Sequence, residues 1–174
     1  MEYDSLGVDF TSRARRFEEQ IQLLRRLWTE ESVRHYGRFD HIEHAGLRPL
    51  PMQRPIPIWI GCADAPRALE RVGKLADGWI PHPQLTWCGE LESALEKVRR
   101  IAESSGRQLG LQGHVRWLEH SPADLGQAAD RWLAAGDTHI AINTLRAGLS
   151  WPGGHIAALQ EVAKRWQLPS PATR

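Results

Sequence analysis

Apolar residues along this chain follow two alternating periods, one typical of buried strands and one typical of amphipathic helices. The run 56–60 is short and almost wholly apolar, as in a parallel strand with both faces covered. Apolar residues at helical spacing follow it, namely Ala68, Leu69, Val72 and Leu75. This part of the chain is therefore predicted to form a strand and then a helix.

The same order recurs three more times toward the C-terminus. A strand at 78–80 precedes a helix at 90–104, and a strand at 111–118 precedes a helix that starts near 121–124. A strand at 138–143 precedes the last helix. The buried faces expected for these last two helices are Leu125, Ala129, Trp132 and Leu133 in one, and Ile156, Leu159, Ala163 and Trp166 in the other. Four successive βα units predict an α/β fold with a parallel sheet covered by helices.

The first third of the chain shows different patterns. A helix is predicted over 12–29, with Phe17, Ile21, Leu24 and Trp28 on its apolar face. The segment 33–42 alternates loosely around a glycine, which favours a small hairpin or an extended excursion. Four prolines in 48–57 predict an extended connector. We expect one domain over 1–168 and a disordered tail at 169–174.

Composition and charge narrow the classes of function. Lys and Arg number 22 against 21 Asp and Glu, so the net charge of +1 gives no basic footprint for nucleic acid or an anionic membrane. No apolar run reaches the roughly 20 residues that span a bilayer, and the acidic first residues are unlike a signal peptide. Cys62 and Cys88 lack metal-ligand spacing and are expected to be reduced thiols in a cytoplasmic protein.

Ligands of parallel α/β folds bind at the carboxyl ends of the strands. The candidate segments there are 61–64, 81–83, 119–121 and 143–149. In the first of these, Gly61 permits a sharp turn, and Asp64 and Pro66 stand where an N-cap and the first helical residue are expected. Free N–H groups at such a helix start attract phosphate. The alternative is an ordinary βα turn, because one glycine is a weak phosphate signal.

Several side chains have two interpretations. His35, His41 and His44 are expected to serve surface or hairpin packing rather than bind a metal. His82 is either a loop residue or a general acid/base, and His155 is expected to cap or pack the last helix. Two tryptophans near the expected pocket, Trp59 and Trp79, either fill the core or stack on a flat ring. Arg13, Arg15 and Arg16 are expected on a solvated helix face, with anion binding as the alternative.

An ordered set of motifs resembles the luciferase-like monooxygenase superfamily over nearly the whole chain. The motifs are Arg15-Arg16-Phe17-Glu18-Glu19-Gln20-Ile21, Leu24-Arg25-Arg26-Leu27-Trp28-Thr29, Tyr36-Gly37-Arg38-Phe39, Pro55-Ile56-Pro57-Ile58-Trp59-Ile60-Gly61, Ala76-Asp77-Gly78-Trp79, Thr138-His139-Ile140-Ala141-Ile142-Asn143-Thr144 and His155-Ile156. The set looks most like the branch that uses the deazaflavin F420, with FMN users next. The resemblance implies the second half of a (β/α)8 barrel, from the helix after strand four to strand and helix eight.

The same resemblance implies a cofactor site. Gly61, Cys62, Ala63 and Asp64 would help to hold the cofactor phosphate, and Gly78, Trp79 and Pro81 would lie near the cofactor end of the barrel. Asn143 and Thr144 would cap strand eight. The family's acid/base groups lie largely in the first half, so no catalytic residue is assigned. The expected chemistry is hydride transfer to or from a small organic substrate.

Half a barrel has two open strand edges and an uncovered core. The resemblance therefore also implies either that the chain is a fragment of a barrel or that it has a partner, in a homo-oligomer or as a chain that supplies the other half-barrel. The alternative to an oxidoreductase is a non-catalytic half-barrel or subunit that binds cofactor or a partner chain.

Overall fold

A four-stranded parallel sheet forms the centre of the computed structural model, which describes residues 2–85, 89–117, 124–136 and 138–167. Its strands are β3 (Trp59–Cys62), β4 (Gly78–Pro81), β5 (Gly110–Arg116) and β6 (His139–Asn143), in that spatial order. All neighbouring pairs are parallel, which confirms the predicted α/β fold. Strand β3 begins three residues later than the predicted run, because Pro55 and Pro57 have no N–H to donate to a ladder.

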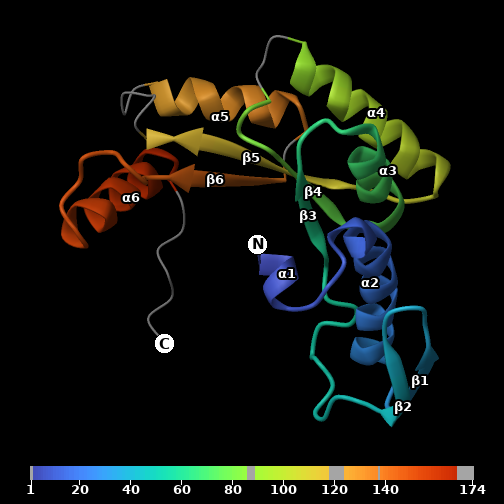
Figure 1. Ribbon diagram of the computed structural model, residues 1–174. Coiled ribbons are helices and arrows are strands. Elements are labelled where there is room, and N and C mark those ends of the chain that lie inside the picture. The colour runs from blue at the N-terminus through green and yellow to red at the C-terminus, as the bar shows by residue number, and fades with distance from the viewer. Residues whose placement is uncertain (1, 86–88, 118–123, 137, 168–174) are drawn as a thin grey trace.

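Helices α3 (Pro66–Leu75), α4 (Glu90–Ser104) and α5 (Asp124–Ala134) lie along one side of this sheet (Figure 1). Side chains of one sheet face meet them in a single core, in which Trp79, Leu111 and Val115 are buried with residues of all three helices. The helical contributions to this core are Leu69, Val72, Leu91, Ala94, Leu95, Val98, Leu125 and Trp132. The predicted helix at 90–104 matches the observed one at both ends.

The apolar faces of three helices differ in part from the predicted ones. In α5, Leu133 is 56% exposed, and in α6 (Gly153–Arg165) Ile156 and Leu159 are exposed while Ala158 and Val162 are buried. In α2 (Arg13–Thr29), Phe17 and Leu24 are exposed while Ile21 and Leu23 are buried. Periodicity locates an apolar stripe, but the neighbours of a helix decide which part of the stripe is covered.

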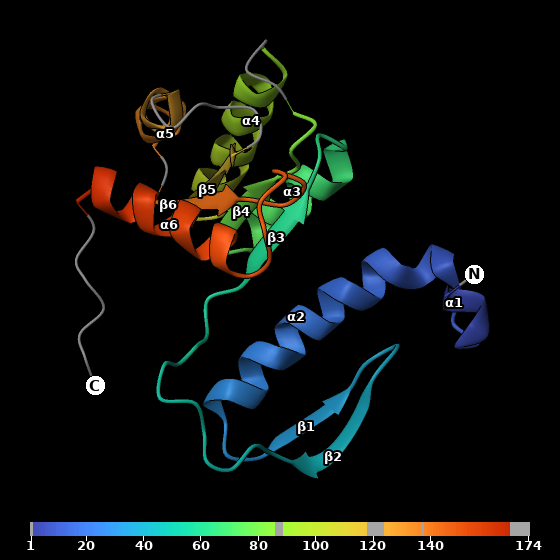
Figure 2. The same cartoon turned by 90° about the vertical axis from the view of Figure 1, so that its left-hand side faces the viewer.

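The N-terminal third forms a separate layer beside the sheet (Figure 2). Helix α1 (Glu2–Ser5) and the 3-10 turn η1 (Phe10–Ser12) lead into α2, which is followed by the antiparallel pair β1 (Val33–Tyr36) and β2 (His41–Ala45). The predicted hairpin is thus confirmed. Glu19 of α2 fixes its turn, since its carboxylate accepts hydrogen bonds from the N–H groups of residues 38–40 and from His35 Nε2.

Helix α6 lies at the end toward which β5 and β6 point (Figures 1 and 2). That end is the carboxyl edge of the sheet, where ligands of such folds bind. Within the described residues, no helix is long and apolar enough to cross a membrane.

Candidate functional site

The register of the sheet divides its side chains between two faces. Trp59 pairs with Gly78, which pairs with Gly110, and on the other side of β5 His114 pairs with Ala141 and Arg116 with Asn143. By alternation, these residues lie on one face, here called the Trp59 face. Its members on the four strands are Trp59, Gly61, Gly78, Ile80, Gly110, Gln112, His114, Arg116, His139, Ala141 and Asn143. The opposite face packs against α3, α4 and α5.

Trp59 closes the amino end of the Trp59 face. Its indole lies over Gly78 and Gly110, where a Cβ on Gly110 would come within 2.7 Å of the Trp59 ring and one on Gly78 would overlap it. The far side of the indole meets the His139 ring edge-on, with centroids 4.7 Å apart. Gly78 was expected near the cofactor end, but it opens β4 at the opposite end of the strand. Packing of the Trp59 ring therefore explains why glycine stands at both positions.

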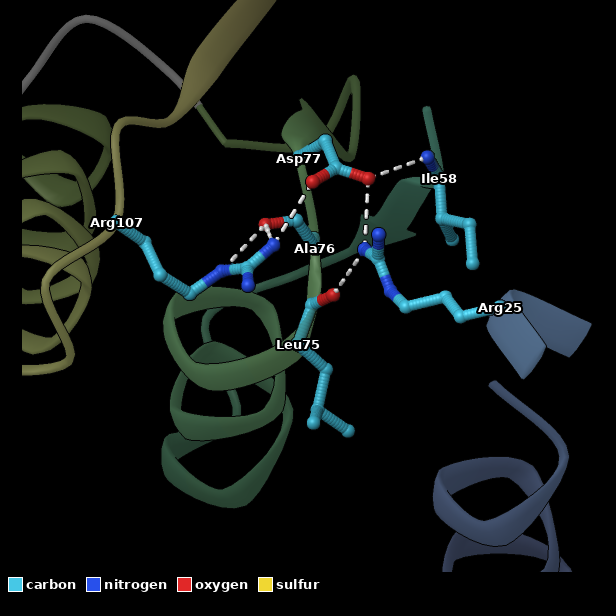
Figure 3. Close-up of polar contacts among 6 residues, drawn as sticks. All are labelled: Arg25, Ile58, Leu75, Ala76, Asp77 and Arg107. Atoms are coloured by element: carbon cyan, nitrogen blue, oxygen red, sulfur yellow. Dashed lines mark hydrogen bonds and ion pairs between the residues drawn. The ribbon is translucent and has the colours of Figure 1, made fainter. Parts of the chain in front are cut away.

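Asp77, in the motif just before β4, is the centre of an ionic clamp at the same amino end (Figure 3). Its carboxylate accepts hydrogen bonds from Arg25 Nη2 at 2.7 Å, from Arg107 Nη2 at 2.8 Å and from the Ile58 N–H at 2.8 Å. The same two guanidinium groups donate to the carbonyl groups of Leu75 and Ala76. The clamp therefore ties α2, the chain before β3, the start of β4 and the loop before β5 together, which is a structural role.

Trp79 is fully buried on the face that packs against the helices. Its indole fills the core, so the side chain offers no surface to a ligand in this structure. Trp79 could therefore contact a cofactor only through its backbone in β4. Such a contact stays a prediction.

The segment 61–64 lies at the carboxyl edge, as the sequence predicted, but the sharp turn expected at Gly61 is wrong, because Gly61 and Cys62 are the last residues of β3 and pair with β4. Gly61 and Asp64 are exposed, and Cys62 and Ala63 are half-buried. The predicted N-cap is wrong, because Ala65 is the N-cap of α3 and supplies no capping side-chain bond, while Pro66 is the first helical residue as expected. Pro66 has no N–H, and the N–H groups of Ala68 and Leu69 donate to the Ala65 carbonyl, so the Arg67 N–H is the first-turn donor that remains for an anion. Burial raises the pKa of the Cys62 thiol, so the thiol stays protonated at neutral pH.

His82, His114 and Arg116 lie near the carboxyl ends of β4 and β5. Of these three residues, only His82 was a candidate from the sequence. His114 and Arg116 lie on the Trp59 face of β5, level with Ala141 and Asn143 of β6. Burial, and next the charge of nearby His82, lowers the pKa of His114. Alternation along the sequence could have predicted that His114 and Arg116 share a face. In 111–116, polar residues alternate with Leu111, Gly113 and Val115, which puts the polar side chains on one face of the strand.

Asn143 and Thr144 end β6 and organise the loop toward α6. The Asn143 side-chain oxygen accepts the Leu145 N–H at 2.8 Å, and Thr144 Oγ1 is hydrogen-bonded to His155 Nδ1 at 2.9 Å. His155 also meets the exposed Trp151 edge-on. The expectation that His155 packs the start of the last helix is confirmed.

The remaining histidines of interest lie in the β1–β2 hairpin. His35 contacts Glu19, His41 packs edge-on against Tyr36, and His44 is exposed beside Glu43. In the part of the chain that the structure describes, no group of three or more His, Cys, Asp and Glu side chains is arranged to hold a metal ion. Arg13 stacks on the Phe10 ring at 3.7 Å.

Some predictions fall on residues that the structure does not describe. These are the loop candidates 119–121, the start of the helix after it, Cys88 and the tail 169–174.

Comparison with known proteins identifies the family. The family model described as luciferase-like monooxygenase matches residues 1–163. The chain belongs to the luciferase-like monooxygenase family. The resemblance given by the sequence motifs is therefore confirmed.

Relatives of this luciferase-like chain include a protein named as an F420-dependent enzyme. An F420-dependent glucose-6-phosphate dehydrogenase of Segniliparus rotundus is 27% identical over 172 residues, which cover 93% of this chain and 49% of that protein. A phthiodiolone/phenolphthiodiolone dimycocerosates ketoreductase of Mycobacterium kansasii is 35% identical over 104 residues, covering 58% of this chain and 28% of that protein. An uncharacterised Mycobacterium tuberculosis protein is 32% identical over 126 residues, covering 71% and 41%. The chain spans about half or less of the length of these relatives.

Solved structures place the luciferase-like chain on a barrel fold. The monooxygenase RslO1 from Streptomyces bottropensis has a TM-score of 0.54 at 21% identity, covering 92% of this chain and 48% of that one. A coenzyme F420 dependent tetrahydromethanopterin reductase from Methanopyrus kandleri has a TM-score of 0.50 at 16% identity, covering 67% and 39%. The four βα units correspond to part of a TIM-like barrel, as the sequence predicted.

Proposed function

We propose that this chain forms part of the cofactor site of an F420-dependent oxidoreductase, with FMN as the alternative cofactor. Its family and its F420-dependent relatives support the general class of flavin or deazaflavin chemistry. The observation that carries the proposal is the turn 61–64, which stands at the carboxyl edge before a helix whose N-terminus has no side-chain cap.

The residues of this turn fit a phosphate-bearing cofactor. Gly61 is exposed, and a Cβ there would meet only the Ile80 carbonyl oxygen, at 3.8 Å, so a ligand can approach its backbone. Cys62 and Ala63 carry no hydroxyl group, which leaves backbone N–H groups and the dipole of α3 as the source of attraction. Gly61, Cys62, Ala63 and Asp64 would hold the phosphate, while the Asp64 carboxylate must turn away from it.

The bound cofactor would accept or donate the hydride, and this chain would bind and orient it. The substrate is a small organic molecule placed over the carboxyl ends of β4, β5 and β6. No residue of this chain is assigned the acid/base role.

A fluorescence titration tests the proposal. The purified chain is titrated with F420 and, separately, with FMN, with its tryptophan emission as a second readout. Saturable binding of one cofactor at micromolar affinity supports the proposal and names the cofactor. Absence of binding by the chain alone means that the other half-barrel is needed, and absence of binding by the completed assembly contradicts the proposal and favours a non-catalytic half-barrel.

We further propose that a second chain or half-barrel completes the sheet. In the described residues, β3 and β6 each pair with a single strand, and two helices carry exposed apolar side chains. These side chains are Phe17 and Leu24 on α2, and Ile156 and Leu159 on α6. Eight strands close a barrel without open edges, so either a second copy or a chain supplying the other half fits this geometry.

A further inference from the structure

Three side chains that bear nitrogen donors gather where β4 and β5 end. His114 and Arg116 are two residues apart on β5 and therefore share the Trp59 face. His82 directly follows β4, and its N–H donates to the Cys62 carbonyl at 3.0 Å, so it continues the strand at the level of the turn 61–64. By alternation from Ile80, the His82 side chain lies on the Trp59 face as well.

His114 lacks a hydrogen bond that its position calls for. Its Nε2 atom is buried and has no partner among the described residues. A buried polar atom without a partner costs free energy, and native structures seldom leave one unpaired. Since His82 lies close enough to disfavour a second positive charge on His114, a ligand of opposite charge would relieve both costs.

The charge around this position favours an anion over a cation. No Asp or Glu stands on the Trp59 face of the four described strands, so this face offers no acidic ligand for a cation. A metal ion would find only two imidazoles, too few for a stable site. A carboxylate or phosphate would accept hydrogen bonds from both imidazoles and would favour the protonated form of His114.

We propose that His82 and His114, with Arg116 beside them, form a subsite for the carboxylate or phosphate group of an anionic substrate. The subsite lies over β4 and β5, whereas the turn assigned to the cofactor phosphate follows β3. The inference rests on the proposed function only where it calls the ligand a substrate.

Histidine side-chain NMR of the full chain tests this subsite. The protein is titrated with sodium phosphate and with sodium acetate at pH 6.5, with chloride replaced so that ionic strength stays constant. We expect the ring resonances of His82 and His114 to shift saturably and the apparent pKa of His114 to rise in the presence of either anion. Shifts that are absent, or that chloride reproduces, overturn the proposal.

Three variants locate the response. His114→Gln and His82→Gln are each expected to weaken phosphate binding about tenfold, as loss of one charge-assisted hydrogen bond implies. His44→Gln, on the exposed hairpin strand, serves as the matched control and is expected to bind phosphate as the unchanged chain does. Because His82 is exposed and follows the strand, its replacement tests the site even if His114→Gln impairs folding. Equal binding by all three variants contradicts the proposal.

A repeat of the phosphate titration with saturating F420 separates the two sources of an anionic group. A response of His114 that persists assigns the subsite to a second ligand, as proposed. A response that F420 abolishes assigns it to the cofactor's own phosphate and overturns the substrate assignment. If F420 and FMN both fail to bind while phosphate still shifts His114, the proposed function fails and the anion subsite stands.

Discussion

At the scale of single residues, close packing explains much of the sequence pattern at the amino end of the sheet. Trp59 can lie flat across two strands only because glycine stands at both positions beneath it. The indole thus covers the amino end of the Trp59 face. Gly78 and Gly110 are needed because a larger residue would collide with this ring, and not because of their backbone conformation.

Replacement of Gly78 by alanine should destabilise the fold by about 1–3 kcal/mol, since the new Cβ overlaps the Trp59 ring. Gly126→Ala is the matched control, because a Cβ added there has nothing within 4 Å and alanine is the better helix former. That variant should be neutral or up to about 1 kcal/mol more stable. Urea unfolding followed by tryptophan fluorescence measures both, and equal stabilities would refute the packing argument.

Glu19 illustrates a charge whose role is to organise a turn. Desolvation raises the pKa of Glu19, but hydrogen bonds from the Phe39, Asp40 and Arg38 N–H groups and from His35 outweigh it and lower the pKa to about 2. A depressed carboxyl pKa contributes stability that is fully present above the unfolded value of 4.5 and lost as the pH falls toward 2.

The chain should therefore lose stability between about pH 5 and pH 2, and Glu19→Gln should make this loss shallower while lowering stability at pH 7. Urea midpoints across this pH range measure the effect. Glu31→Gln, whose side chain is 82% exposed, is the control and should keep the slope of the unchanged chain. A Glu19→Gln slope equal to that of the control would contradict the assigned role.

At the scale of elements, a few polar contacts decide how helices and strands are joined. The Asp77 clamp connects four segments that are far apart in the sequence, with its three charged side chains 24–30% exposed. Such partly buried, multiply bonded ions contribute more than solvent-exposed pairs.

Asp77→Asn should destabilise the chain by about 1–3 kcal/mol, because two guanidinium groups lose their counter-ion. The comparison variant is Glu96→Gln, which breaks the i,i+4 pair with Arg100 in which both side chains are 73% exposed. Its cost should stay below about 0.5 kcal/mol. Chemical unfolding at low and high salt measures both, and similar costs would show that the clamp has no special role.

A capping side chain at the start of α3 should raise the stability of the chain and lower its affinity for the cofactor. Ala65→Asp should stabilise the chain by about 1 kcal/mol by capping the helix, and should weaken cofactor binding because its carboxylate occupies the same N–H groups. Gln108→Asp adds the same charge at an exposed position before β5 and should change neither. Thermal unfolding and the cofactor titration measure the two effects. Unchanged cofactor affinity in Ala65→Asp would remove the turn from the cofactor site.

At the scale of the whole molecule, the described residues leave both outer strands of the sheet, β3 and β6, paired on one side only. Apolar side chains are also left exposed on two helices, where Leu24 on α2 and Ile156 on α6 are 40% and 52% exposed. Surfaces of this kind mark contacts with another part of an assembly.

Leu24→Glu and Ile156→Glu should leave the stability of the isolated chain within about 0.5 kcal/mol and should abolish association. Light scattering coupled to size-exclusion chromatography measures the mass of each variant, alone and mixed with a half-barrel that supplies the other four strands. Leu133→Glu, at an exposed site on α5, is the control and should associate as the unchanged chain does. Association that survives both edge substitutions would contradict the proposed contact.

The order and types of the elements from α2 onward, and the family, could be predicted from the residues alone, whereas α1 and η1 were not. Alternating runs of strand and helix period are local properties, and they sufficed for the four βα units, the hairpin after the first helix and the helix at 90–104. The turn 61–64 could be placed at the carboxyl edge for the same reason, because a parallel strand followed by a helix has only one such edge.

What each side chain in those elements contacts became clear only in the folded chain. Trp59 and Trp79 look alike in the sequence, yet the register places one over two glycines on the inner face and buries the other against the helices. The proposed role of His114 depends on His82, which comes near it only when β4 and β5 pair. Periodicity is set by neighbours along the chain, whereas burial, register and charge depend on residues that folding brings together across it.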